Sequence, residues 1–179
     1  MHGLIFVQLK KYASSRLGPE AWDELLRKAA LTGRMYLPVQ QYPDDEFAAL
    51  VRALSLRTGG DADALLENLG AFMAPELMRM YGSLLRPSWT TLDVVEHTEH
   101  TIHRVVRARN PGARPPELKA ERTAPDEVVV TYDSPRRMCG FAKGVVRGLA
   151  RHFRETVTLD EETCMLRGDA CCRLRVRKA

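Results

Sequence analysis

The sequence predicts an α+β fold, in which an N-terminal helical region ending in one long helix precedes a small antiparallel β-sheet with a C-terminal helix. Apolar residues recur at helical spacing through roughly the first 110 residues. After the pair Pro115-Pro116, short alternating and β-branched runs take over, which is typical of strands. A length of 179 residues suits a single domain with a substantial core.

Helix breakers and caps divide the helical region. Gly18-Pro19 separates the first two helices, and acidic residues from Asp44 onward suit the first turn of a third. Gly59-Gly60 ends that helix and Asp61 caps the next. The predicted helices span residues 4–17, 19–31, 44–58, 61 to about 72, 75–85 and 88–109.

The last third of the chain predicts two hairpins and one helix. Strands are expected at 117–122 and 127–132, around the turn at Pro125. A helix is expected at 139–153, followed by a final hairpin of strands at 155–159 and 172–176.

The composition is that of an ordinary globular protein, with 45% apolar and 28% charged residues. No apolar run approaches the roughly 20 residues that span a bilayer, and the N-terminus lacks the features of a signal peptide. A cytoplasmic location is therefore expected. The net charge of +4 is modest and the basic residues are dispersed, which argues against nucleic-acid binding.

The long helix carries three histidines, of which His103 is expected to face the interior. At about 100° per residue, His103 falls roughly 20° outside an apolar stripe, whereas His97 and His100 lie much further away. Glu99 falls inside the stripe and makes it less clean. His103 is either a buried histidine that bonds a neighbour or a metal ligand. The stripe consists of Leu92, Val95, Ile102 and Val106.

Tyr132, Ser134 and Arg136 follow an apolar strand at the point where the chain turns toward the next helix. Two hydroxyls and a guanidinium so closely spaced suit a doubly anionic ligand. Together with an inward imidazole, this donor cluster suggests a metalloporphyrin. The alternative is helix capping, with Ser134 or Asp133 as the cap and Pro135 as the first helical residue.

At this point the chain resembles the heme nitric oxide/oxygen binding family, known as H-NOX or HNOB, of bacterial gas sensors and soluble guanylate cyclase. The resemblance covers the whole chain and implies a single domain over residues 1–179. It implies a distal helical subregion at 1–60 and a proximal subregion, with the heme-ligand helix and the sheet, at 61–179. The matching motifs are Met1-x-Gly3 with Ile5, Ile102-His103, Pro115-Pro116 and Tyr132-x-Ser134-x-Arg136.

The resemblance implies heme b as the cofactor and assigns a role to each matching residue. His103 would be the proximal iron ligand, and Tyr132, Ser134 and Arg136 would donate hydrogen bonds to the heme propionates. Pro116 would press on the porphyrin and hold it non-planar.

The same resemblance places Ile5, Leu9, Met73 and Phe141 around the distal side of the heme. Phe141 stands where oxygen-binding members have a tyrosine hydroxyl. Bound oxygen needs a hydrogen-bond donor and NO needs much less. The expected ligands are therefore NO and CO, without a stable oxygen complex.

Four cysteines form a second group, with Cys139 at the start of the late helix and Cys164, Cys171 and Cys172 in the last hairpin. In an intracellular chain such clustering suggests metal or redox chemistry, and reduced thiols or a disulfide from Cys172 to Cys139 or Cys164 are the alternatives.

The spacing also resembles a zinc-binding subset of the family, which implies Cys139, Cys164 and Cys172 as ligands. The fourth ligand of that subset would lie just before Cys164, where residues 161–163 are Glu-Glu-Thr. Cys171 and His152 are the substitutes considered, although adjacent strand residues such as Cys171 and Cys172 point to opposite faces.

No enzyme is expected, because neither a nucleophile with its base nor a phosphate-cradling loop is present. As no kinase or cyclase follows in this chain, a sensor would act on a separate histidine kinase, cyclic-di-GMP enzyme or chemotaxis protein, the partners that the family implies. The competing expectation is a heme-free or zinc/thiol-based redox regulatory module of the same fold.

Overall fold

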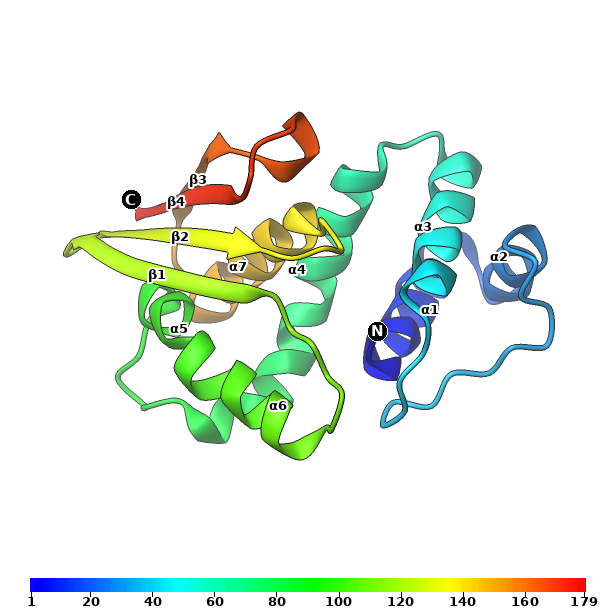
Figure 1. Cartoon of the computed structure of the whole chain (residues 1–179), viewed down its shortest axis with the longest axis horizontal. Helices are drawn as coiled ribbons and strands as arrows, with labels where there is room; N and C mark the ends of the chain where they lie inside the picture. Colours follow the sequence, from blue (N-terminus) through cyan, green and yellow to red (C-terminus); the bar gives the residue numbers. More distant parts are fainter.

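The computed structural model describes all 179 residues and confirms the α+β fold. The first three helices lie on one side of a central pair of helices, and the β-sheet with the remaining helices lies on the other side (Figure 1). None of the helices is both long enough and apolar enough to cross a membrane. The helices are α1 (Gly3–Leu17), α2 (Ala21–Lys28), α3 (Asp44–Thr58), α4 (Ala62–Tyr81), α5 (Thr91–His97), α6 (Arg104–Arg109) and α7 (Cys139–Phe153).

The two predicted hairpins form one antiparallel sheet with the strand order β1-β2-β4-β3. The sheet is continuous because β4 pairs with β2 as well as with β3, and this places Tyr132 opposite Cys172. Three strands extend beyond the predicted ranges, and the strand predicted at 155–159 is shifted, beginning at Val157 and running to Thr163. The strands are β1 (Glu117–Ala124), β2 (Glu127–Asp133), β3 (Val157–Thr163) and β4 (Cys172–Lys178).

The outer face of the sheet explains its longer strands. Glu127 at the start of β2 bonds Arg175 and Arg177 of β4, and Glu162 of β3 bonds Arg173. Such cross-strand pairs of opposite charge stabilise a sheet. Charged residues at the strand ends therefore continue the pairing that the apolar runs begin.

Two hydrophobic cores lie on opposite sides of the α4–α7 pair. One core joins α1, α2 and α3 with Leu65 and Leu69 of α4. The other core packs α5 and α7 against one face of the sheet, where Val130 and Leu174 are buried. Figure 1 shows α1–α3 at one end of the molecule and the sheet at the other, with α4 and α7 between them.

Glycines bring α4 and α7 into backbone contact. A Cβ atom on Gly144 would lie 1.9 Å from the carbonyl oxygen of Glu67, and one on Gly70 would lie 2.2 Å from that of Phe141. A side chain at either position would therefore push the two helices apart. This close approach fixes Phe141 next to α4.

Several helix boundaries differ from the prediction, and two of the differences have a clear physical reason. The second helix ends at Lys28 rather than near Leu31, because Ala30 is left-handed with φ 58° and the Leu31 amide bonds back to the carbonyl of Leu26. The fourth helix does not stop before Pro75 but runs through it to Tyr81. Burial of the adjacent Met73 and Ala74 outweighs the hydrogen bond that a proline removes.

The long helix predicted at 88–109 is interrupted. It consists of α5, a π-helical turn at Glu99–His103 and α6. The His103 amide bonds the carbonyl of Thr98, five residues back, instead of a carbonyl four residues back. The uniform 100° spacing used to place the histidines therefore does not hold across this turn.

Candidate functional site

A mostly apolar cavity of about 300 Å³ lies between α1, α4, α7, the π turn and the sheet, and 23 of its 33 lining residues are hydrophobic. It receives side chains from both sides of the α4–α7 pair. All but one of the residues predicted to bind a cofactor line it, namely Ile5, Met73, His103, Pro116, Tyr132, Ser134, Arg136 and Phe141.

Leu9 is the predicted cofactor contact that does not line the cavity. It is fully buried in the core of α1, α2 and α3. In this structure Leu9 contributes to that core, behind the cavity wall that Ile5 forms on the same helix.

His103 enters the cavity wall from the π turn, with its ring held by a carboxylate. Its Nδ1 atom lies 2.9 Å from Oε2 of Glu99. Burial is the main cause that lowers the pKa of His103 below its ordinary value, against the opposing effects of Glu99 and the Pro116 backbone. The imidazole is therefore neutral near pH 7.

The tautomer of His103 follows from its partner. Burial of Glu99 opposes its ionisation, but hydrogen bonds from His103 and Arg107 hold the pKa of Glu99 below its ordinary value. A carboxylate only accepts hydrogen bonds, so Nδ1 of His103 carries the proton and donates it. Nε2 therefore keeps its lone pair, which is what a metal ion requires of a histidine ligand.

Tyr132, Ser134 and Arg136 meet at one edge of the cavity. The Tyr132 hydroxyl accepts a hydrogen bond from the Met138 amide at 3.2 Å, and burial raises its pKa, so its own proton remains available. Ser134 Oγ accepts from the Arg136 amide at 3.3 Å. The capping alternative is wrong, because α7 begins only at Cys139.

The Arg136 guanidinium is held in place by one residue of α3 and one residue of the loop before β1. Nε bonds Oδ2 of Asp44 at 2.9 Å, and Nη1 bonds the carbonyl of Arg114. These contacts use two of its three nitrogen atoms and leave Nη2 for an anion. With two hydroxyls beside it, this edge suits carboxylates such as heme propionates.

The cavity fits a heme in its chemistry. A planar hydrophobic macrocycle suits the apolar lining, a neutral imidazole suits its iron, and the donors at one edge suit its two carboxylates. Tyr81, which the sequence analysis did not single out, also lines the cavity, and it lies near Arg109 at the end of the helix that follows His103.

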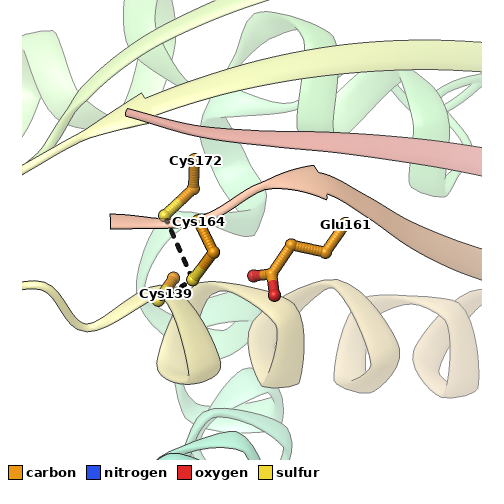
Figure 2. A group of neighbouring side chains, drawn as sticks. All are labelled: Cys139, Glu161, Cys164 and Cys172. Atoms are coloured by element: carbon orange, nitrogen blue, oxygen red, sulfur yellow. Dashed lines mark hydrogen bonds between the residues drawn. The ribbon is translucent and has the colours of Figure 1, made fainter. Parts of the chain in front are cut away.

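The cysteine group is compact, as Figure 2 shows. The Cys164 sulfur lies 3.6 Å from that of Cys139 and 3.9 Å from that of Cys172, and all four cysteines are free thiols, so the disulfide alternatives are wrong in this structure. Burial raises the pKa of the Cys139 and Cys172 thiols. Cys171 and His152 lie outside the group.

Glu161 completes the cysteine group. Its carboxylate lies with the sulfurs of Cys139, Cys164 and Cys172 within 4.8 Å of one another, pointing toward Cys164 in Figure 2. Oε1 is buried without a hydrogen bond, although Nζ of Lys143 is 3.4 Å away. Three thiols and a carboxylate with an unbonded buried oxygen suit a four-coordinate zinc ion.

The acidic partners of the site do not stand out in the motifs of the sequence. Glu99 lies four residues before His103, a spacing at which helical side chains meet. Glu161 follows Val157 and Leu159 on the inner face of β3, so its alternation alone signals an inward carboxylate. Asp44 is 92 residues from Arg136, and no local pattern links the two.

A family model described as Haem-NO-binding (HNOB) matches residues 2–161 of the chain. No curated protein shows significant similarity to it.

Solved structures of H-NOX proteins share the whole fold. An H-NOX protein from S. oneidensis in the Fe(II)NO ligation state is 24% identical, with a TM-score of 0.93 over 100% of this chain and 99% of that one. The unliganded Fe(II) H-NOX protein from K. algicida is 21% identical, with a TM-score of 0.88 over 100% of this chain and 97% of that one.

Proposed function

Because the chain belongs to the Haem-NO-binding family, we propose that it is a heme-based sensor that binds NO and CO and signals to a separate partner protein. The observation that carries this proposal is the apolar cavity with the neutral imidazole of His103 in its wall and the donors Tyr132, Ser134 and Arg136 at its edge. A bound heme supplies a ferrous iron with one coordination position open to a small gas.

Different residues of the cavity would bind different parts of a heme. Nε2 of His103 would bind the iron, and Tyr132, Ser134 and Arg136 would bind the propionates. Pro116, also in the cavity wall, would press on the porphyrin plane. Because these residues belong to different elements, the position of the heme would be linked to the position of each.

The signal would begin at His103. If binding of NO to the heme loosens the bond to His103, α6, which begins at the next residue, would be free to shift. Pro116 in the cavity wall would press on the heme before that release and less strongly after it. We propose that residues 1–60 act as the distal unit and residues 61–179 as the proximal unit of this movement.

The gas selectivity would come from the apolar side of the cavity. Ile5, Met73 and Phe141 line it and carry no hydrogen-bond donor on their side chains. Bound oxygen acquires negative charge and is stabilised by a donor, whereas NO and CO depend on one much less.

Absorption spectroscopy of the purified protein tests the proposal. The reduced protein should show a heme Soret band, respond to NO and CO, and form no lasting oxygen complex in air. His103→Ala should change the spectrum of the unliganded form, whereas His100→Ala, on the exposed side of the π turn, should not. A colourless protein would instead support the heme-free regulatory module.

A zinc ion is the second proposed ligand, held by Cys139, Cys164, Cys172 and Glu161. The support is the compact group with its unbonded carboxylate oxygen. Metal analysis of protein purified without a polyhistidine tag should find one zinc per chain, and Cys164→Ser should remove it. Cys171→Ser is the matched control, because Cys171 lies outside the group and its loss should leave zinc in place.

We propose a class of signalling protein as the partner. A cytoplasmic histidine kinase, a cyclic-di-GMP enzyme or a chemotaxis protein, acting as a separate chain, would receive the signal. Pull-down of purified candidates with the NO-bound and unliganded protein would identify the one whose binding changes.

A further inference from the structure

The carboxylate of Glu99 makes three contacts at the back of His103. Oε2 accepts the proton of His103 Nδ1 at 2.9 Å and a hydrogen bond from the Leu118 amide at 3.3 Å. Oε1 is paired with the guanidinium of Arg107. Glu99 therefore links the histidine to the start of β1 and to the outer face of α6.

Glu99 and His103 lie side by side on the π turn, with His103 in the cavity wall and Glu99 behind it. Both residues belong to the same five-residue turn, Glu99 with 20% and His103 with 14% of its side chain exposed. In such partial burial a hydrogen bond between an imidazole and a charged carboxylate is stronger than in water.

A carboxylate on the far nitrogen of a metal-bound histidine fixes its ring and makes it a stronger donor. The negative charge pulls the Nδ1 proton toward itself and pushes electron density to Nε2. A stronger donor favours the ferric over the ferrous state and shortens the bond to iron.

On the basis of the proposed heme function, we propose that Glu99 is a positioning residue that strengthens the bond from His103 to the iron, with Arg107 opposing it. Glu99 and Arg107 together set how readily NO releases His103. The ligand is a ferrous heme, and the effect is a sensitivity setting built into the π turn.

Arg107 opposes Glu99 because it shares the same carboxylate. Its positive charge attracts the electrons that would otherwise act on the Nδ1 proton. Removing Arg107 leaves the full negative charge facing His103, while removing the charge of Glu99 leaves none. The two substitutions are therefore expected to act in opposite directions, which a general loss of packing would not produce.

The test uses resonance Raman spectra and midpoint potentials of the heme-loaded protein and its variants. Glu99→Gln should lower the iron–histidine stretching frequency and favour the ferrous state roughly tenfold, the lower end of what such partners cost, equal to about 59 mV for one electron. Arg107→Gln should shift both quantities the opposite way. NO should release His103 more readily in Glu99→Gln.

Glu96→Gln is the matched control, because it removes a carboxylate that bonds Arg122 rather than the histidine. It should leave both quantities at the wild-type value. The inference is overturned if Glu99→Gln or Arg107→Gln also stays there, or if both shift in one direction. A wild-type protein without heme or without an iron–histidine stretch would instead overturn the proposed function, and the inference with it.

Discussion

Phe141 lies at a position where a small change in the side chain is expected to alter gas binding. It lines the cavity at the first turn of α7, and its backbone is fixed against Gly70 of α4. A hydroxyl added to its ring would reach further into the cavity. Under the proposed function, the gas preference would depend on a single atom at this residue.

Phe141→Tyr should stabilise an oxygen complex that the wild type does not hold, because a hydroxyl would then be available to the partial negative charge on oxygen. Absorption spectra of the reduced variant in air would show it. Phe72→Tyr is the control, since Phe72 packs on Tyr12 outside the cavity. A variant as insensitive to oxygen as the control would rule out the assigned position of Phe141.

His103→Gly should resemble the NO-bound state, because the helix is then released from the iron without NO. Amide hydrogen exchange of α6 in the variant, supplied with heme and free imidazole, should match NO-bound wild type. His100→Gly should match unliganded wild type. If His103→Gly also matches the unliganded protein, release of the histidine is not the signal.

At the scale of elements, α4 and α7 form the most extensive contact in the fold, with their backbones in close approach. An added Cβ on Gly144 would meet backbone atoms of Glu67, which cannot move aside as the end of a flexible side chain can. A methyl group there forces the two helices apart and strains both cores beside them.

Gly144→Ala should therefore lower the free energy of unfolding by about 1–3 kcal/mol, the usual cost of overpacking. Urea denaturation measures this. Gly82→Ala is the control, because Gly82 has a helical φ of −56° and nothing within 4 Å of an added Cβ. It should be neutral or slightly stabilising. Equal effects of the two substitutions would mean that the helices do not pack as closely as this.

Elements with local signals were predictable and those set by packing were not. Asp61 caps α4 as its residue type suggests, with its carboxylate accepting from the Ala64 amide. The π turn was not predictable, because helical periodicity assumes one spacing throughout. The continuation of α4 through Pro75 depends on burial that is visible only in the folded chain.

The candidate site was predictable where its residues form a pattern along the chain. His103 and Ser134 line one cavity, and Cys164 lies in the cysteine group. Glu161 was not predictable as a zinc ligand, because one glutamate among the charged residues of a strand forms no ligand pattern of its own. Asp44 meets Arg136 through tertiary structure alone, across 92 residues.

At the scale of the whole molecule, buried carboxylates tie distant segments together. Glu155 accepts a hydrogen bond from the Thr91 amide and pairs with Lys178. Although its burial opposes ionisation, hydrogen bonds from Lys178 and Thr91 hold the pKa of Glu155 below its ordinary value. Glu155 thus joins α5 and β4 more strongly while it is ionised.

A lowered pKa in the folded state means that Glu155 stabilises the fold at pH values above its unfolded pKa of about 4.3. This stabilisation is lost as the pH falls through the pKa that Glu155 has in the folded state. Glu155→Gln should be less stable by about 1–2 kcal/mol at pH 7, with the difference shrinking toward pH 3. Urea denaturation at both pH values measures this. Glu117→Gln, at an exposed position, should be neutral, and a difference that persists at pH 3 would contradict the charge argument.

The π turn also separates two helices that are held in place to different degrees. α5 is anchored by the capping box of Thr90 and Asp93 and by Glu155, whereas α6 is a short helix without buried residues. Between them, the hydroxyls of Thr98 and Thr101 bond to carbonyls four residues back, which loosens a helix further. The segment therefore consists of a firmly held helix, α5, and a weakly held helix, α6, joined by an irregular turn. Movement of His103 is expected to rotate α6 rather than α5, so a partner protein that detects the gas is expected to contact α6.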